Sequence, residues 1–234
     1  MPHTVQNLTI ESLLEELSAH PVNANKFFVN FQECYLTRSQ LHTFIRQYHF
    51  FCHRFVKVLE GLLYQTPLEE LEMRVQLTKT LYSELGSGSL NHAHIRHLEQ
   101  FSQAAGLAQE DLTHTEPIPE VRQYLEVLHN LFIESEYLQA LGAELAVETT
   151  AVSEFRYFLP GLQKYPQFTP KDLTFFSMHL EEEITHSDWL ATAVKKTTQT
   201  SDDLEQVALG ARRTANAWHT FWNGMHRAIF DSCA

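Results

Sequence analysis

The sequence contains little of what disulfide-rich, fibrous and membrane proteins need. Three cysteines, Cys34, Cys52 and Cys233, with no Cys-x-x-Cys pair make neither a disulfide framework nor a thiolate zinc site. Eight glycines and eight prolines in 234 residues are too few for a disordered or collagen-like chain. No run approaches the roughly 20 uncharged apolar residues of a membrane span, and the N-terminus has no signal-peptide pattern. We therefore expect a globular cytoplasmic protein without a membrane partner.

Basic residues are also scarce. Seventeen Lys and Arg stand against 29 Asp and Glu, which gives a formal net charge of −12. Binding a phosphate backbone requires clustered positive charge, and the sequence contains no basic stripe, so nucleic acid is excluded as an expected partner. No repeat, low-complexity tract or linker-like change of composition divides the chain. We expect one domain over residues 1–234.

Strand-forming patterns are nearly absent. Val and Ile never alternate over a strand length, whereas Leu, Glu, Gln, Ala and Phe recur at spacings of three and four, which predicts an all-α protein. We expect a single bundle of seven to nine helices. The expected helices cover about residues 10–19, 22–34, 37–64, 68–85, 90–106, 120–148, 149–162, 169–195 and 201–230. The clearest start is Thr169-Pro170-Lys171-Asp172, which combines an N-cap Thr with Pro at the first helical position.

Histidine, by contrast, is abundant, with 14 residues. On the helix that follows Thr169, the side chains of His179, Glu183 and His186 project within about 60° of one another. Imidazole and carboxylate suit iron or manganese, and Glu-x-x-His pairs build di-iron sites in helical bundles. The adjacent run of three glutamates is equally typical of a solvent-exposed face. Large apolar residues on both sides of the stripe favour the metal site, because a buried polar stripe must be paired or metallated.

Other candidate ligands lie on neighbouring predicted helices. Glu148 ends a helical stretch of small and apolar residues, and Glu84 precedes a Gly-Ser break. His92, His94 and His97 follow that break, and at most one of them can join Glu84 in one site. Helical angles cannot be carried across a non-helical break, so spacing alone leaves the choice open.

Together these segments resemble a known family. The segment Glu84-Leu85-Gly86-Ser87-Gly88, followed by His94, Phe101 and Gly106, resembles the E-L-G-x-G…H…F…G segment of the haem-oxygenase-like di-iron oxidases. The stretch that leads to Glu148 resembles the second carboxylate helix of that family. His179-x-x-x-Glu183-x-x-His186 resembles its H-x3-[DE]-x2-H motif. The resemblance spans about residues 22–195 in the order and spacing of the family.

The resemblance implies a haem-oxygenase-like fold, a homodimer, two Fe(II) ions and O₂ as co-substrate, with neither haem nor flavin. It implies six metal ligands that are also the catalytic residues: Glu84, His94, Glu148, His179, Glu183 and His186. By analogy Glu84 would bridge the two irons, with His94 and His186 on one iron and the remaining ligands on the other. Some family members add a carboxylate from the long helix that precedes Glu84, and Glu60 is the candidate here.

Members of this family carry out different reactions, including N-oxygenation, cleavage of fatty acids to terminal alkenes, fragmentation of amino acids and conversion of an amino acid to a nitrile. One branch makes p-aminobenzoate from its own side chains, with two tyrosines and a lysine near the metals. The matching positions here are Phe28, Phe44 and Phe158, whose phenyl rings cannot play those parts. This difference at all three positions therefore disfavours a self-consuming reaction.

The same three phenylalanines are expected to bind substrate as the wall of an apolar cavity, which suits a flat aromatic molecule. Arg46 or Arg156 would meet the charged end of an amino acid. We expect a small amino-acid-derived, aromatic substrate, with conversion of a tryptophan-type amino acid to a nitrile as the first choice. Three alternatives stay open: a di-iron fatty-acid decarboxylase, a metal-free protein of cofactor biosynthesis or thiaminase type, and a non-enzymatic metal-binding or interaction protein.

Overall fold

The computed structural model describes residues 8–231, with the backbone but not the side chains of residues 181–189. The described chain contains no strand, which confirms the all-α class. It forms ten α-helices: α1 Ile10–Ser18, α2 Lys26–Glu33, α3 Arg38–Gln65, α4 Leu71–Glu84, α5 His94–Ala104, α6 Gln109–Thr113, α7 Pro119–His129, α8 Tyr137–Gln163, α9 Thr174–Thr197 and α10 Ser201–His226. This is one more than the upper end of the expected range, because the short helix α6 was not predicted. No helix in the described part is long and apolar enough to cross a membrane.

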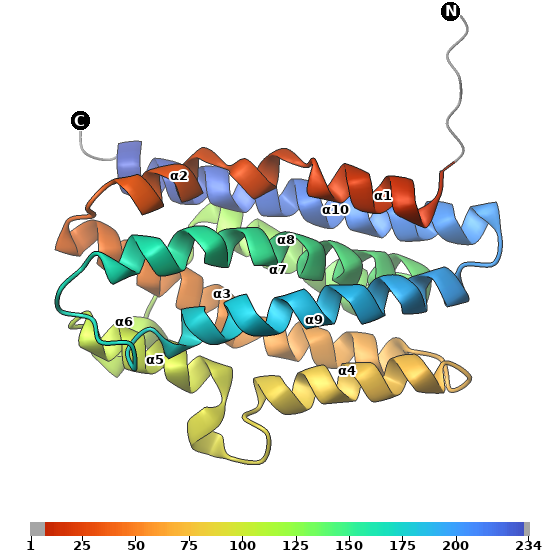
Figure 1. Ribbon diagram of the computed structural model, residues 1–234, viewed down its shortest axis with the longest axis horizontal. Helices are drawn as coiled ribbons and strands as arrows, with labels where there is room; N and C mark the ends of the chain where they lie inside the picture. Colours follow the sequence, from red (N-terminus) through yellow and green to blue (C-terminus); the bar gives the residue numbers. More distant parts are fainter. Residues whose placement is uncertain (1–7, 232–234) are drawn as a thin grey trace, which may run out of the picture.

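Helix α8 lies at the centre of the bundle. It packs most extensively against α10 and next against α9, and Figure 1 shows α4 and α5 on the side away from α1, α2 and α10. The α8 and α10 backbones meet at two glycines. A Cβ on Gly142 would lie 1.9 Å from the carbonyl oxygen of Val207, and one on Gly210 would lie 1.9 Å from that of Gln139. Glycine is therefore required at both positions for this contact.

The boundaries of α8 differ from the prediction in two ways. The helix expected over 120–148 is interrupted, because α7 gives way to a π-helical segment, Asn130–Glu134, before α8 begins at Tyr137. The break expected near Thr149 does not occur, and the Thr149 hydroxyl donates to the Leu145 carbonyl of the same helix at 2.6 Å. Pro160 lies in the last turn of α8, which ends at Gln163, close to the expected end at 162. Residues 144 to 154 thus share one uninterrupted helix.

One predicted helix start shifts and another is confirmed. Asp172 accepts a hydrogen bond from the Thr169 backbone N–H at 2.8 Å, as in an N-cap, but this turn is not continued and regular helix begins at Thr174. Helix α10 begins at residue 201 as expected, and its cap is Thr200. Its hydroxyl oxygen accepts from the backbone N–H of Asp203 at 3.1 Å.

Candidate metal centre

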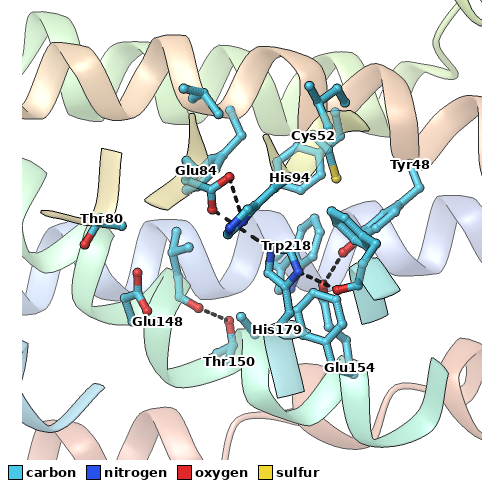
Figure 2. A pocket seen from close by; sticks show the side chains of 18 of the residues that line it. Tyr48, Cys52, Thr80, Glu84, His94, Glu148, Thr150, Glu154, His179 and Trp218 are labelled. Atoms are coloured by element: carbon cyan, nitrogen blue, oxygen red, sulfur yellow. Dashed lines mark hydrogen bonds and ion pairs between the residues drawn. The ribbon is translucent and has the colours of Figure 1, made fainter. Parts of the chain in front are cut away.

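A cavity of about 80 Å³ lies inside the bundle, between helices α3, α4, α5, α7, α8, α9 and α10. This is several times the space that one water needs. Much of the wall is apolar, and Figure 2 shows most of the polar residues around it. The polar, thiol and indole side chains that line it are Tyr48, Cys52, Thr80, Glu84, His94, Tyr124, Glu148, Thr150, Glu154, His179 and Trp218.

A tight loop brings Glu84 and His94 together. Glu84 is the last residue of α4, and the chain then reverses through Gly86 and Gly88, with φ of 87° and 89°. His94 opens α5, is buried, and places its Nδ1 3.1 Å from Glu84 Oε2. His92 on the same loop is exposed. The geometry therefore selects His94 among the three histidines that follow the break.

Gly86 should be required for this arrangement. A Cβ at Gly86 would lie 2.2 Å from the Ser89 carbonyl oxygen, and the positive φ adds strain of about 1–2 kcal/mol. We expect Gly86→Ala to weaken iron binding at least about tenfold, measured by anaerobic titration, because it moves one ligand relative to the other. Gly88→Ala is the matched control, since its φ is similar but its Cβ meets only the Tyr82 hydroxyl, at 3.1 Å. Equal iron affinities of the two variants would contradict this role for Gly86.

His179 extends from α9 toward the same pair. Its Nδ1 lies 2.7 Å from the carbonyl oxygen of Phe175, and because a carbonyl only accepts, Nδ1 carries the proton. The other ring nitrogen, Nε2, then has its lone pair on the side of the cavity, 4.0 Å from Glu84 Oε1. The ring stacks on Phe155 with centroids 4.8 Å apart, which fixes its orientation.

Glu84, His94 and His179 form a group that can hold a metal ion. They offer ligand atoms that all lie within 4.8 Å of one another (Figure 2). Glu148 is buried and lines the same cavity. This set of carboxylate oxygens and imidazole nitrogens fits iron. Glu183 and His186 lie four and seven residues after His179 on α9, but their side chains lie outside the described residues.

The cavity is acidic. Its described lining includes three glutamates and neither Lys nor Arg. Glu144, one helical turn before Glu148, is 1% exposed. Burial, followed by the charge of Glu148 and a hydrogen bond with it, raises the pKa of Glu144 well above its ordinary value. So many buried carboxyls in one place favour a bound cation, which would lower the cost of burying their charge.

Two of the acidic residues around the cavity were missed in the sequence. Glu144 could have been found from the sequence, because it lies four residues before Glu148 and so on the same face of one helix. Glu154 lies four residues after Thr150 and seven after Val147, which line the same cavity, but the sequence does not show that this face of α8 meets the cavity. Tyr48 of α3, 106 positions away in sequence, donates to Glu154 at 2.6 Å.

The phenylalanines expected in the cavity wall lie elsewhere. Phe28, Phe44 and Phe158 are at most 1% exposed and do not belong to the lining of the described cavity. The Phe158 ring centroid lies 5.3 Å from that of Phe44 and 5.4 Å from that of Trp222, inside a packed aromatic core. The aromatic wall exists, but other residues form it: Tyr48, Phe51, Phe55, Tyr124, Phe155, Phe175 and Trp218.

The other polar candidates also lie away from the cavity. Glu60 is half-exposed and pairs with Lys57 at 2.6 Å on the outer side of α3, so the described structure does not place it with the ligands. Arg156 is exposed, and Arg46 does not belong to the lining. Neither arginine is placed to meet a substrate in this cavity.

Comparison with known proteins agrees with the geometry. A family model described as iron-containing redox enzyme matches residues 42–219. The chain is 25% identical over 227 residues to a 4-aminobenzoate synthase of Nitrosomonas europaea, covering 93% of this chain and 89% of the relative.

Solved structures share the fold. A CADD-like protein of unknown function from Nostoc punctiforme matches with a TM-score of 0.79 and 22% identity, over 94% of this chain and 98% of that chain. A Shewanella denitrificans domain with a heme oxygenase-like fold matches with a TM-score of 0.72 and 13% identity, over 96% of this chain and 93% of that one. With a family model that spans most of its length and this all-α fold, the chain belongs to the haem-oxygenase-like family of iron-containing redox enzymes.

Proposed function

We propose that the protein is a non-haem di-iron enzyme that uses O₂ to oxidise a small organic substrate. The observation that carries this proposal is the grouping of Glu84, His94 and His179 beside Glu148 in an acidic internal cavity. Together with Glu183 and His186 of α9, these residues would hold two irons. The metal, when bound, supplies the electrons that O₂ accepts. The donor set of three carboxylates and three imidazoles is the reason for proposing two ions.

The protein itself has three tasks in such a reaction. The Phe175 carbonyl fixes the tautomer of His179, so that Nε2 can act as a ligand. The carboxylate of Glu84 lies 3.1 Å from His94 Nδ1 and 4.0 Å from His179 Nε2. Glu84 therefore lies between the candidate ligands from α5 and α9. The aromatic walls exclude water from the reacting centre, which protects reactive species and strengthens electrostatic interactions there.

We propose a small aromatic, amino-acid-derived substrate, with conversion of a tryptophan-type amino acid to a nitrile as the first choice. Flat rings suit a cavity walled by Phe51, Phe155, Phe175 and Trp218. The described lining offers no Lys or Arg to a substrate carboxylate, so the metal site is the only positive region proposed for that group.

Formation of 4-aminobenzoate is a second candidate, favoured by the name of the Nitrosomonas europaea relative. It faces the difficulty that Phe28, Phe44 and Phe158 occupy the positions where the self-consuming branch is expected to have tyrosines and a lysine. An external aromatic precursor would remove that difficulty.

Anaerobic titration with ferrous iron tests the proposal. We expect two irons per chain at saturation, followed by O₂ uptake when a substrate amino acid is added and a product detected by mass spectrometry. A nitrile supports the first choice, 4-aminobenzoate the second, and a terminal alkene from a fatty acid would overturn both. A saturating ratio of one would contradict the di-iron assignment, and no binding would favour the metal-free proteins of this fold.

A further inference from the structure

Glu154 is a buried carboxyl on the cavity that the candidate metal centre does not use. It lies on α8, is 3% exposed and lines the same cavity as Glu84 and His94. The group of clustered ligand atoms found in the described residues does not include it. Figure 2 shows His179 between the Glu84 and His94 pair and the carboxyl of Glu154.

The hydrogen bonding of Glu154 is incomplete. Its Oε1 accepts from the Tyr48 hydroxyl at 2.6 Å, whereas its Oε2 has no hydrogen-bond partner in the described structure. Burial raises the pKa of Glu154 to about 8, and the Tyr48 hydroxyl, together with the nearby Trp218 indole, opposes the rise. An unsatisfied buried carboxyl oxygen destabilises the folded state. An N–H group of a ligand would satisfy this oxygen, and a cationic donor would also favour the ionised carboxylate that burial disfavours.

The surroundings of Glu154 indicate what kind of ligand could supply the donor. Two aromatic side chains, Tyr48 and Trp218, contact the carboxyl and line the cavity. Tyr124 packs on Trp218 with ring centroids 4.5 Å apart and extends this wall. No Lys or Arg of the described lining competes for the carboxyl. A flat aromatic molecule with an N–H group can stack on these rings and donate a hydrogen bond to the carboxyl.

We propose that Glu154 binds the nitrogen of an aromatic, N–H-bearing substrate and so holds the opposite end of that molecule toward Glu84, His94 and His179. This inference rests on the proposed function for the identity of the ligand as substrate, and it narrows the substrate class to N–H donors. The donor is either a ring N–H or a side-chain ammonium. Both make the same contact with the free carboxyl oxygen.

Calorimetric binding of paired probes tests this assignment, with ferrous-loaded protein under nitrogen so that no turnover occurs. Indole is compared with benzofuran, in which oxygen replaces the ring N–H, and phenethylamine with ethylbenzene. We expect the wild-type protein to prefer the nitrogen compound of at least one pair by about tenfold or more. The pair that shows the preference identifies the donor as ring N–H or ammonium. No preference in either pair would overturn the assignment.

Glu154→Gln should abolish that preference, because the uncharged amide turns either its own N–H groups or its single oxygen acceptor toward the ligand. The affinity for benzofuran or ethylbenzene should stay within about twofold of the wild-type value. The matched control is Glu99→Gln, which alters another buried glutamate, one paired with Arg96 at 2.6 Å and absent from the described cavity lining. It should keep the wild-type preference. An unchanged preference in Glu154→Gln would contradict the proposal.

Two further readouts keep the result interpretable. Glu154→Asp, which withdraws the acid by one methylene, should reduce the preference at least about threefold and serves if the Gln variant does not fold. Iron content is measured on every sample and should equal that of wild type in both Glu154 variants. Failure of the wild-type protein to bind iron would count against the proposed function, whereas failure of the probe preference with full iron loading would count against Glu154 alone.

Discussion

Replacing His94 with alanine should lower the bound iron by at least one ion per chain and reduce O₂-dependent turnover by at least about 100-fold. His94 is buried, lies 3.1 Å from Glu84, and is the one imidazole that the Gly86 loop delivers to the site. Loss of residues that only orient ligands costs about 10- to 100-fold, so loss of a ligand should cost no less. Iron content by metal analysis and oxygen uptake by electrode measure the two effects.

The control for this variant lies one turn further along α5. His97→Ala removes a half-buried imidazole that does not line the described cavity, and it should leave iron content and turnover within about twofold of wild type. Circular dichroism should show nearly unchanged helix content in both variants. Full iron loading of His94→Ala, or equal losses in both variants, would contradict the assignment of His94 as a ligand.

Gly142→Ala should destabilise the fold by about 3 kcal/mol or more, because its added methyl would meet the backbone of α10 rather than a movable side chain. For a chain of this size that corresponds to a fall in Tm of about 6–12 °C. Thermal unfolding followed by circular dichroism measures it. Since α8 carries Glu148, iron affinity should fall as well.

Gly61→Ala provides the comparison. A Cβ there would lie 2.5 Å from Cγ1 of Ile133, whose side chain is 40% exposed and can rotate away, and 3.3 Å from the Phe132 carbonyl oxygen. The gain in helix propensity, about 1 kcal/mol, should offset the remaining crowding. We expect a change of less than about 1 kcal/mol in the free energy of unfolding. A similar loss of folding free energy in both variants would contradict the requirement for glycine at the α8–α10 contact.

Parts of this structure follow from local sequence rules, and others do not. The expected start of the helix over 37–64 is confirmed, because the capping box of Thr37 and Gln40 that begins α3 involves only groups within four residues of one another. The end of α7 and the start of α8 could not be located, since no Gly or Pro marks Ser135 or its neighbours. The end of α8 at Gln163, by contrast, lies within one residue of the expected end at 162, where Pro160 and Gly161 mark it.

The candidate site divides in the same way. His179 and its neighbours on α9 were recognisable because helical angles apply within one helix. Joining Glu84 to His94 needed a family resemblance, because positive φ values in the loop erase angular information. Hydrophobicity could not distinguish Phe158 in the core from Phe155 in the cavity wall, since both are apolar and buried. Glu154 was missed because the sequence does not show which face of α8 meets the cavity, although it shares that face with Thr150.

The most direct test of the account is an anomalous difference map, recorded on both sides of the iron absorption edge from crystals grown anaerobically with ferrous iron. The account predicts two iron peaks in the internal cavity, within bonding distance of Glu84, His94 and His179, with Glu148 and the side chains of Glu183 and His186 completing the coordination. Iron peaks only at surface carboxylates, or an internal cavity without iron in crystals that contain it, would contradict the central claim.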